Sequence, residues 1–357
     1  MTHCPLPRYL LVTIACFLEN GVRPALIPVL INYFQNREMT VKWHGCHSLP
    51  RKVNGGGPQG ATLGLLEYLS QSNNSADMVN ESDRFKFIDD LSILEIVNLL
   101  TVGITSFNIK LQVPADLPLH NQFIPPGSLK SQDWLDGIND WTVKQKMMIN
   151  EKKCKTMIFN YTDNYQFTTR LTINNKQLDV IDSTKLLGTI LSNNLSWDLN
   201  TANIVKKANA RMQLLRKVAS FGTSQGELKD IYILFIRSLL EQSATVWHSS
   251  LTEENVTDLE RVQKTAVKII LGDNYLSYEQ GLQKLDMENL SERRAALCLS
   301  FAQKCAKNPK TAQMFPKNVK VHNMETRQPE TYIVQHSNTE RLRKSSIIYM
   351  QHLLNKT

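Results

Sequence analysis

Two adjacent carboxylates, Asp89 and Asp90, are the residues whose type and setting best suit chemistry. They lie between the apolar runs 85–88 and 91–94, a pattern that predicts two strands joined by a tight turn carrying both acids. Charges held between buried strands need compensation, and a divalent cation is the natural candidate. An ordinary acidic turn is the alternative, because Asp is favoured in turns for its local hydrogen bonds.

A glycine-rich loop at 54–64 precedes this turn and leads into an apolar helix through Leu69. Glycines let a backbone approach a flat partner, and the start of a helix offers free N–H groups to phosphate. A plain helix start punctuated by glycine is the alternative. The centre of the loop consists of Gly57, Pro58, Gln59 and Gly60.

The Phe87-Ile88-Asp89-Asp90 turn and the Gly-x-Pro-Gln-Gly loop, in this order and at this distance, resemble reverse transcriptases of non-LTR (LINE-like) retrotransposons. The resemblance implies that the loop positions the template and the nucleotide. It also implies that Asp89 and Asp90 are catalytic metal ligands, and that the partners are an RNA template and a DNA primer.

Lys155 lies in a segment, 149–159, that is predicted to be a turn leading into a strand. In the family a lysine motif follows the catalytic turn, and Lys155 takes the position of its lysine. A cation there could steady a triphosphate or protonate the leaving pyrophosphate. The alternative is a lysine that is merely solvated.

The segment 201–218 is the clearest amphipathic helix, with apolar residues at helical spacing along one side. Its remaining surface carries five cations and no acid between the first and the last. Such a flank would suit the phosphates of a primer–template duplex, although most charged helix faces are only solvated. The cations are Lys206, Lys207, Arg211, Arg216 and Lys217.

The other predicted elements follow from periodicity and turn residues. A helix over 25–34 contains Pro28, which must kink it or mark its true first turn. A helix over 134–148 shares Leu135, Ile138 and Trp141 on one face, and Asn174-Asn175 predicts a hairpin turn between 171–173 and 178–181. The rest are a helix over 9–18, a strand over 39–43, and helices over 227–240, 252–271, 289–307 (opened by Ser291) and 339–354.

Composition is compatible with an intracellular protein that meets a polyanion. The chain has 357 residues, 42% hydrophobic content and a net charge of +8. Six cysteines form no Cys-x-x-Cys pair, which fits reduced thiols. The apolar run at 9–18 is too short to span a bilayer and has no small-residue cleavage site after it. We therefore expect a cytoplasmic or nuclear location and no membrane partner, and the oligomeric state stays open.

We expect an α+β fold: a partial right-hand polymerase palm, with an antiparallel sheet and packed helices, followed by a mostly helical thumb and C-terminal region. The expected domains are a truncated palm at 1–165, a β connection with a primer-grip-like hairpin at 166–199, a helical thumb and further helices at 200–308, and a basic tail at 309–357.

The resemblance begins at about Gly21, so the strand that carries the family's first catalytic carboxylate has no counterpart in residues 1–8. Upstream of the glycine-rich loop, the acids are Glu19 and Glu38 alone. Two-metal phosphoryl transfer needs carboxylates from two strands. We therefore expect weak or absent Mg2+ binding and an inactive, N-terminally truncated polymerase. Three hypotheses compete for the chain as it stands: a relic reading frame, a non-catalytic nucleic-acid-binding module, and an active enzyme completed by a separately supplied first half.

Overall fold

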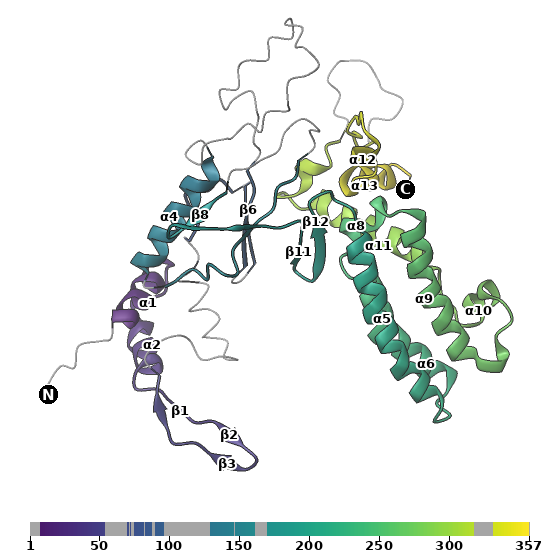
Figure 1. The fold of residues 1–357 in the computed structure, drawn as a ribbon, viewed down its shortest axis with the longest axis horizontal. Coiled ribbons are helices and arrows are strands. Elements are labelled where there is room, and N and C mark those ends of the chain that lie inside the picture. Colours follow the sequence, from purple (N-terminus) through teal and green to yellow (C-terminus); the bar gives the residue numbers. More distant parts are fainter. Residues whose placement is uncertain are drawn as a thin grey trace, which may run out of the picture. The chain divides into compact units, whose positions relative to one another are not determined.

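The structure is a computed structural model that divides into two compact units, Met1–Ile181 and Asp182–Thr357 (Figure 1). The division falls inside the predicted connection at 166–199. The glycine-rich loop residues Gly57, Pro58, Gln59 and Gly60, and also Asp89, lie outside the described residues. The structure describes residues 8–53, 70, 72, 75–81, 83–87, 90–95, 129–145, 147–160, 170–317 and 331–356.

The first unit begins with α1 (Arg8–Glu19), the 3-10 turn η1 (Pro24–Leu26) and α2 (Ile27–Phe34). Their apolar faces meet in a small core in which the rings of Phe17 and Phe34 stack with centroids 6.4 Å apart. Pro28 lies in the first turn of α2, where its missing N–H leaves no hydrogen bond unmade. Of the two alternatives for Pro28, the structure therefore favours the first turn over a kink.

Short antiparallel strand pairs follow α2. β1 (Glu38–Met39) pairs with β4 (Arg51–Lys52), and β2 (Lys42–Trp43) pairs with β3 (Cys46–His47) inside that loop. The single strand predicted over 39–43 is therefore wrong, because Thr40 and Val41 separate two strands of two residues each.

A second core of this unit lies between a hairpin and a helix. The hairpin is formed by β5 (Arg84–Phe87) and β6 (Asp90–Ile93), and the helix is α4 (Lys130–Lys144). Leu91 and Ile93 of β6 pack with Trp134 and the buried Ile138 of α4. The helix starts and ends about four residues earlier than predicted, and Trp134 joins the inward face beside Ile138.

Four two-residue strands complete the first unit: β7 (Lys155–Thr156), β8 (Thr172–Ile173), β9 (Lys176–Gln177) and β10 (Asp179–Val180). β8 and β9 form a hairpin whose turn residues Asn174 and Asn175 have φ values of 50° and 61°, as a type I′ turn requires. The Asn-Asn turn prediction is confirmed. The second predicted strand of that hairpin is wrong, because β10 pairs in parallel with β7 instead.

The second unit opens with the antiparallel hairpin of β11 (Ser183–Leu186) and β12 (Thr189–Ser192). Its turn residues Leu187 and Gly188 both have positive φ, 47° and 93°. The buried side chain of Asn200 at the start of the following helix accepts a 3.0 Å hydrogen bond from the Ile190 N–H, which ties the hairpin to that helix.

Helices make up the rest of this unit, and α5 packs along α9 around a core that includes Met212, Leu215 and Leu259. The helices are α5 (Asp198–Ala219), α6 (Gln225–Ile231), the π-helix η3 (Tyr232–Arg237), α7 (Ser238–Glu241), α8 (Ala244–Trp247), η4 (His248–Ser250), α9 (Glu253–Leu271), η5 (Gly272–Asn274), α10 (Tyr278–Lys284), α11 (Leu290–Lys307), η6 (Ala312–Met314), α12 (Glu340–Arg343) and α13 (Ser346–Leu354).

Three predicted helices of this unit need correction. The helix predicted over 227–240 starts earlier, behind a Ser224 capping box, and becomes a π-helix in its middle. The N-cap of α11 is Asn289, which accepts from the Glu292 N–H, and Ser291 is already helical. The helix predicted over 339–354 is two helices, because the chain leaves helical geometry between α12 and α13. Among the helices that the structure describes, none is both long and apolar enough to cross a membrane.

Candidate active site and nucleic-acid interface

The β5–β6 hairpin has the predicted order of strand, turn and strand, with each strand starting one residue earlier than expected. Phe87 and Asp90 are the last Cα partners of the pair, so the two strands are joined by Ile88 and Asp89 alone. Asp90 is exposed at the start of β6, whereas Leu91 and Ile93 contribute to the core against α4. The prediction of two strands joined by a tight turn within 85–94 is thus confirmed. The prediction that the turn carries both acids is wrong for Asp90, which is the first residue of β6 and pairs with Phe87. Asp89 lies outside the described part of the chain.

Glu95, which follows β6, fixes the hairpin to α4. Its carboxylate accepts hydrogen bonds from the N–H groups of Lys130 at 3.0 Å and Ser131 at 2.9 Å. The N-cap residue Leu129 offers no side-chain oxygen, so Glu95 supplies the acceptor and the negative charge that a helix N-terminus favours. No local pattern in the sequence indicates this contact, because 35 residues separate Glu95 from Lys130.

The opposite strand, β5, carries a cation that is partly withdrawn from solvent. Lys86 donates to the Ser72 carbonyl and, at 3.3 Å, to the Ser75 hydroxyl. Desolvation, and then the neighbouring Arg84, lower the pKa of Lys86 below its ordinary value. Arg84 itself pairs with Asp77 at 2.8 Å. The charges of β5 are therefore engaged locally.

The predicted metal ligands are Asp89 and Asp90. Within the residues that the structure describes, no three His, Cys, Asp or Glu side chains gather as a metal site would require. Asp90 is described and Asp89 is not, while Glu19 and Glu38 are both exposed. The Mg2+ site at Asp89 and Asp90 stays a prediction.

Lys155 lies on β7 opposite Asp179 on β10, and its ammonium group forms an ion pair with the Asp179 carboxylate. This hydrogen bond, together with the charge of Lys155, lowers the pKa of Asp179. Lys155 is exposed, and in this conformation its ammonium group is engaged by Asp179. A catalytic role would require the pair to open.

The five predicted cations of α5 are all exposed. Lys206 and Lys217 lie about 20° apart around the helix and about 16 Å apart along it, opposite the buried face. Lys207 and Arg216 flank them on either side. Lys206 and Lys217 have no ion-pair partner among the described residues, so they are available to an external anion.

Arg211 occupies the edge of this surface and is engaged within the protein. Its guanidinium donates to the backbone carbonyl of Phe235, in the π-helix η3. A π-helix shifts hydrogen bonds to i→i+5 and changes which carbonyls need a partner. Part of the Arg211 guanidinium is therefore already used in a hydrogen bond within the protein. Lys206 and Lys217 are the stronger candidates for phosphate contacts.

Part of the sequence is similar to a known mobile-element protein. Over 177 residues, which make up 49% of this chain, it is 27% identical to the RNA-directed DNA polymerase from mobile element jockey of Drosophila funebris. This similarity supports a reverse-transcriptase-like relationship. The matched stretch covers 17% of that polymerase, so the chain spans only a small part of the curated relative. No family model matches the sequence. No solved structure matches it.

Proposed function

We propose that this chain is part of an RNA-directed DNA polymerase of a non-LTR retrotransposon. The similarity to the jockey polymerase carries the proposal, and the β5–β6 hairpin supports it by holding Asp90 exposed at the end of a two-residue connection. In this proposal Asp89 and Asp90 hold catalytic Mg2+, and the loop at 57–60 positions template and nucleotide. An RNA template and a DNA primer are the partners.

We further propose that residues 1–357, as a separate polypeptide, do not extend a primer. Two-metal phosphoryl transfer uses carboxylates from two strands to hold both ions. Mg2+ keeps its own waters and binds weakly to an isolated pair of carboxylates. In the described structure Glu19 ends the helix α1, and Glu38 lies on β1, which pairs with β4 and not with the strands β5 and β6. A further carboxylate-bearing strand would have to come from another segment.

The test is primer extension on a primed RNA template with Mg2+. The purified polypeptide should give no extension. The same polypeptide mixed with the preceding segment of a related polymerase should give extension that Asp90→Asn abolishes. Robust extension by residues 1–357 alone would refute the proposed lack of activity, while extension insensitive to Asp90→Asn would refute the assignment of the site.

The exposed face of α5 favours a second candidate function, duplex nucleic-acid binding without catalysis. Lys206 and Lys217 project from one side of the helix without an ion-pair partner in the described structure. Each phosphate that a lysine neutralises releases counterions, so affinity falls steeply with salt.

Binding of a labelled RNA–DNA hybrid at several salt concentrations tests this function. Lys206→Glu and Lys217→Glu should each weaken binding and reduce the salt slope by about one. Lys264→Glu is the matched control, because it makes the same charge change at an exposed position of α9. Equal losses in all three variants would show a non-specific charge effect and refute α5 as the interface.

A further inference from the structure

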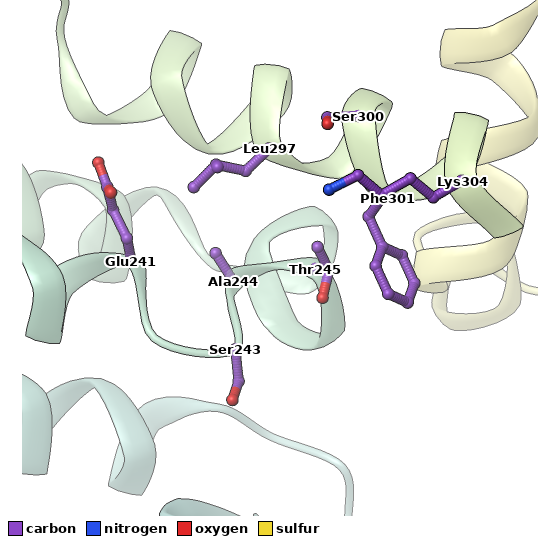
Figure 2. A pocket seen from close by; sticks show the side chains of 8 residues that line it. All are labelled: Glu241, Ser243, Ala244, Thr245, Leu297, Ser300, Phe301 and Lys304. Carbon is purple, nitrogen blue, oxygen red and sulfur yellow. The ribbon is translucent and has the colours of Figure 1, made fainter.

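A groove separates the end of α7 and the start of α8 from α11. Gln242 has a ψ of 123° and Ser243 is left-handed with a φ of 55°, so the helix breaks between α7 and α8. The cavity between this break and α11 has a volume of about 260 Å3 (Figure 2). Pockets for whole small molecules are usually roughly 300–1,000 Å3. This groove fits one planar group of a longer partner better than a complete ligand.

One stripe of α11 forms its wall. Leu297, Phe301 and Lys304 recur at helical spacing and line the groove together with Ser300. The neighbouring stripe of Cys298 and Ala302 is buried in the protein core. The stripe that lines the groove therefore faces outward, and Phe301 is 45% exposed, which is high for a Phe side chain.

Among the residues that the structure describes, the groove lining contains one acid, Glu241, and one cation, Lys304. Glu241 is its acidic lining residue, and that carboxylate already pairs with Arg237 at 3.5 Å and with Arg293. Lys304 is exposed and has no ion-pair partner in the part of the chain that the structure describes. Figure 2 shows the Lys304 amine directed back along α11 toward Leu297, above the groove. An anionic partner therefore complements this site.

The combination of groups narrows the chemistry of that partner. An exposed aromatic ring one helical turn from an unpaired cation can stack a base and contact its phosphate. Thr245 and Ser300 are also lining residues, and a hydroxyl group can accept or donate hydrogen bonds. An acidic peptide would meet the same cation but would make less use of the flat face of Phe301.

We propose that this groove binds one nucleotide of a single-stranded nucleic acid, with the base on Phe301 and the phosphate at Lys304. The proposal adds a single-strand site to the proposed polymerase and rests on that function for its biological setting. The groove shares no residue with the α5 surface that is proposed to bind a duplex. An experiment can therefore refute one of these two proposals without refuting the other.

The experiment measures binding of a fluorescein-labelled oligouridylate to the full chain by anisotropy. Phe301→Ala should weaken binding about five- to tenfold, and Phe301→Tyr, which keeps the ring, should restore it. Lys304→Glu should weaken binding and reduce the salt slope by about one. Lys284→Glu on α10 is the matched charge control and should have less effect.

A 4-thiouridine in the same oligonucleotide gives a second readout. Its photo-cross-link should map to residues 297–304 and disappear in Phe301→Ala. The Lys206→Glu/Lys217→Glu variant should lose hybrid binding but keep this cross-link, which separates the inference from the α5 interface. Unchanged binding in Phe301→Ala, or cross-links only outside 297–304, would overturn the proposal. Binding of a labelled oligoglutamate that is sensitive to Phe301→Ala, without oligouridylate binding, would also overturn it and identify a peptide site.

Discussion

The side chain of Gln263 organises a polar network in the centre of the second unit, and its loss should be among the most damaging substitutions there. The fully buried Gln263 accepts a 2.7 Å hydrogen bond from the Tyr232 hydroxyl. Its amide donates at 2.9 Å to both the Tyr278 hydroxyl and the Glu288 carbonyl. Tyr278 in turn donates to Glu260. We choose Gln263→Leu as the perturbation because leucine is similar in size and makes none of these bonds.

The expected cost follows from the groups left behind. The Tyr232 hydroxyl is buried, and burial raises its pKa well above the usual range, so it remains a neutral donor without a partner. The Glu288 carbonyl loses its bond to the amide as well. Leaving a buried polar group unpaired costs about 1–3 kcal/mol, so Gln263→Leu should lower the free energy of unfolding by about 3 kcal/mol. Tyr232→Phe leaves one unpaired acceptor and should cost about 1–2 kcal/mol.

Hydrogen exchange of the α9 amides is the appropriate assay, because it reports opening of this unit without contributions from the first. The double variant Tyr232→Phe/Gln263→Leu should be more stable than the sum of the single losses predicts, since neither partner is then left unpaired. Additive losses would mean that the two side chains do not depend on each other. If Gln263→Leu lowers the free energy of unfolding by less than about 1 kcal/mol, the proposed role of the network is refuted.

Three further perturbations act on single contacts. In Gly188→Ala the new methyl group would lie 2.6 Å from Gln242 Nε2, and the residue would have to keep a φ of 93°. We expect the free energy of opening, measured by hydrogen exchange of the β11–β12 amides, to fall by about 1–2 kcal/mol. Adding Gln242→Ala should reduce this loss but not remove it, because the positive φ remains. Burial, and then Arg294, lower the pKa of His248 from 6.5 to about 4. Between pH 6.5 and about 4, His248 takes up a proton in the unfolded state but stays neutral in the folded state. The free energy of unfolding should therefore fall by about 1 kcal/mol per pH unit as the pH drops through this range. His248→Asn should remove this pH dependence. Ser224→Ala breaks the capping box and should cost about 1 kcal/mol, seen as faster exchange at the start of α6.

Local sequence rules account for much of the second unit. The helix predicted over 201–218 is α5, and the helix predicted over 252–271 is α9. In both, apolar residues recur at helical spacing and their stripes meet in one core. In the first unit, the Asn174-Asn175 turn could also be predicted from local sequence, because both residues tolerate the positive φ that a tight hairpin needs.

Contacts between distant segments could not be predicted in this way. The Lys155–Asp179 ion pair depends on a parallel pairing of two-residue strands 24 residues apart. The π-helix η3 lies within an apolar run, Tyr232 to Ile236, that contains no Pro or Gly to indicate a change of helix type. Its Phe235 carbonyl bonds to Arg211, which follows from the packing of η3 against α5 and not from the sequence of either.

Local sequence rules predict the two functions proposed for this chain to different degrees. Helix periodicity alone places Lys206 and Lys217 on one exposed side, so duplex binding requires little more than a folded second unit. A catalytic metal site requires Asp90 to meet carboxylates from another strand, which is a property of tertiary assembly. Perturbations of the first unit should therefore abolish extension in the complemented enzyme while leaving duplex binding intact. Asp90→Asn tests this separation directly: a loss of hybrid binding in that variant would show that the two surfaces form one site and would contradict the reasoning.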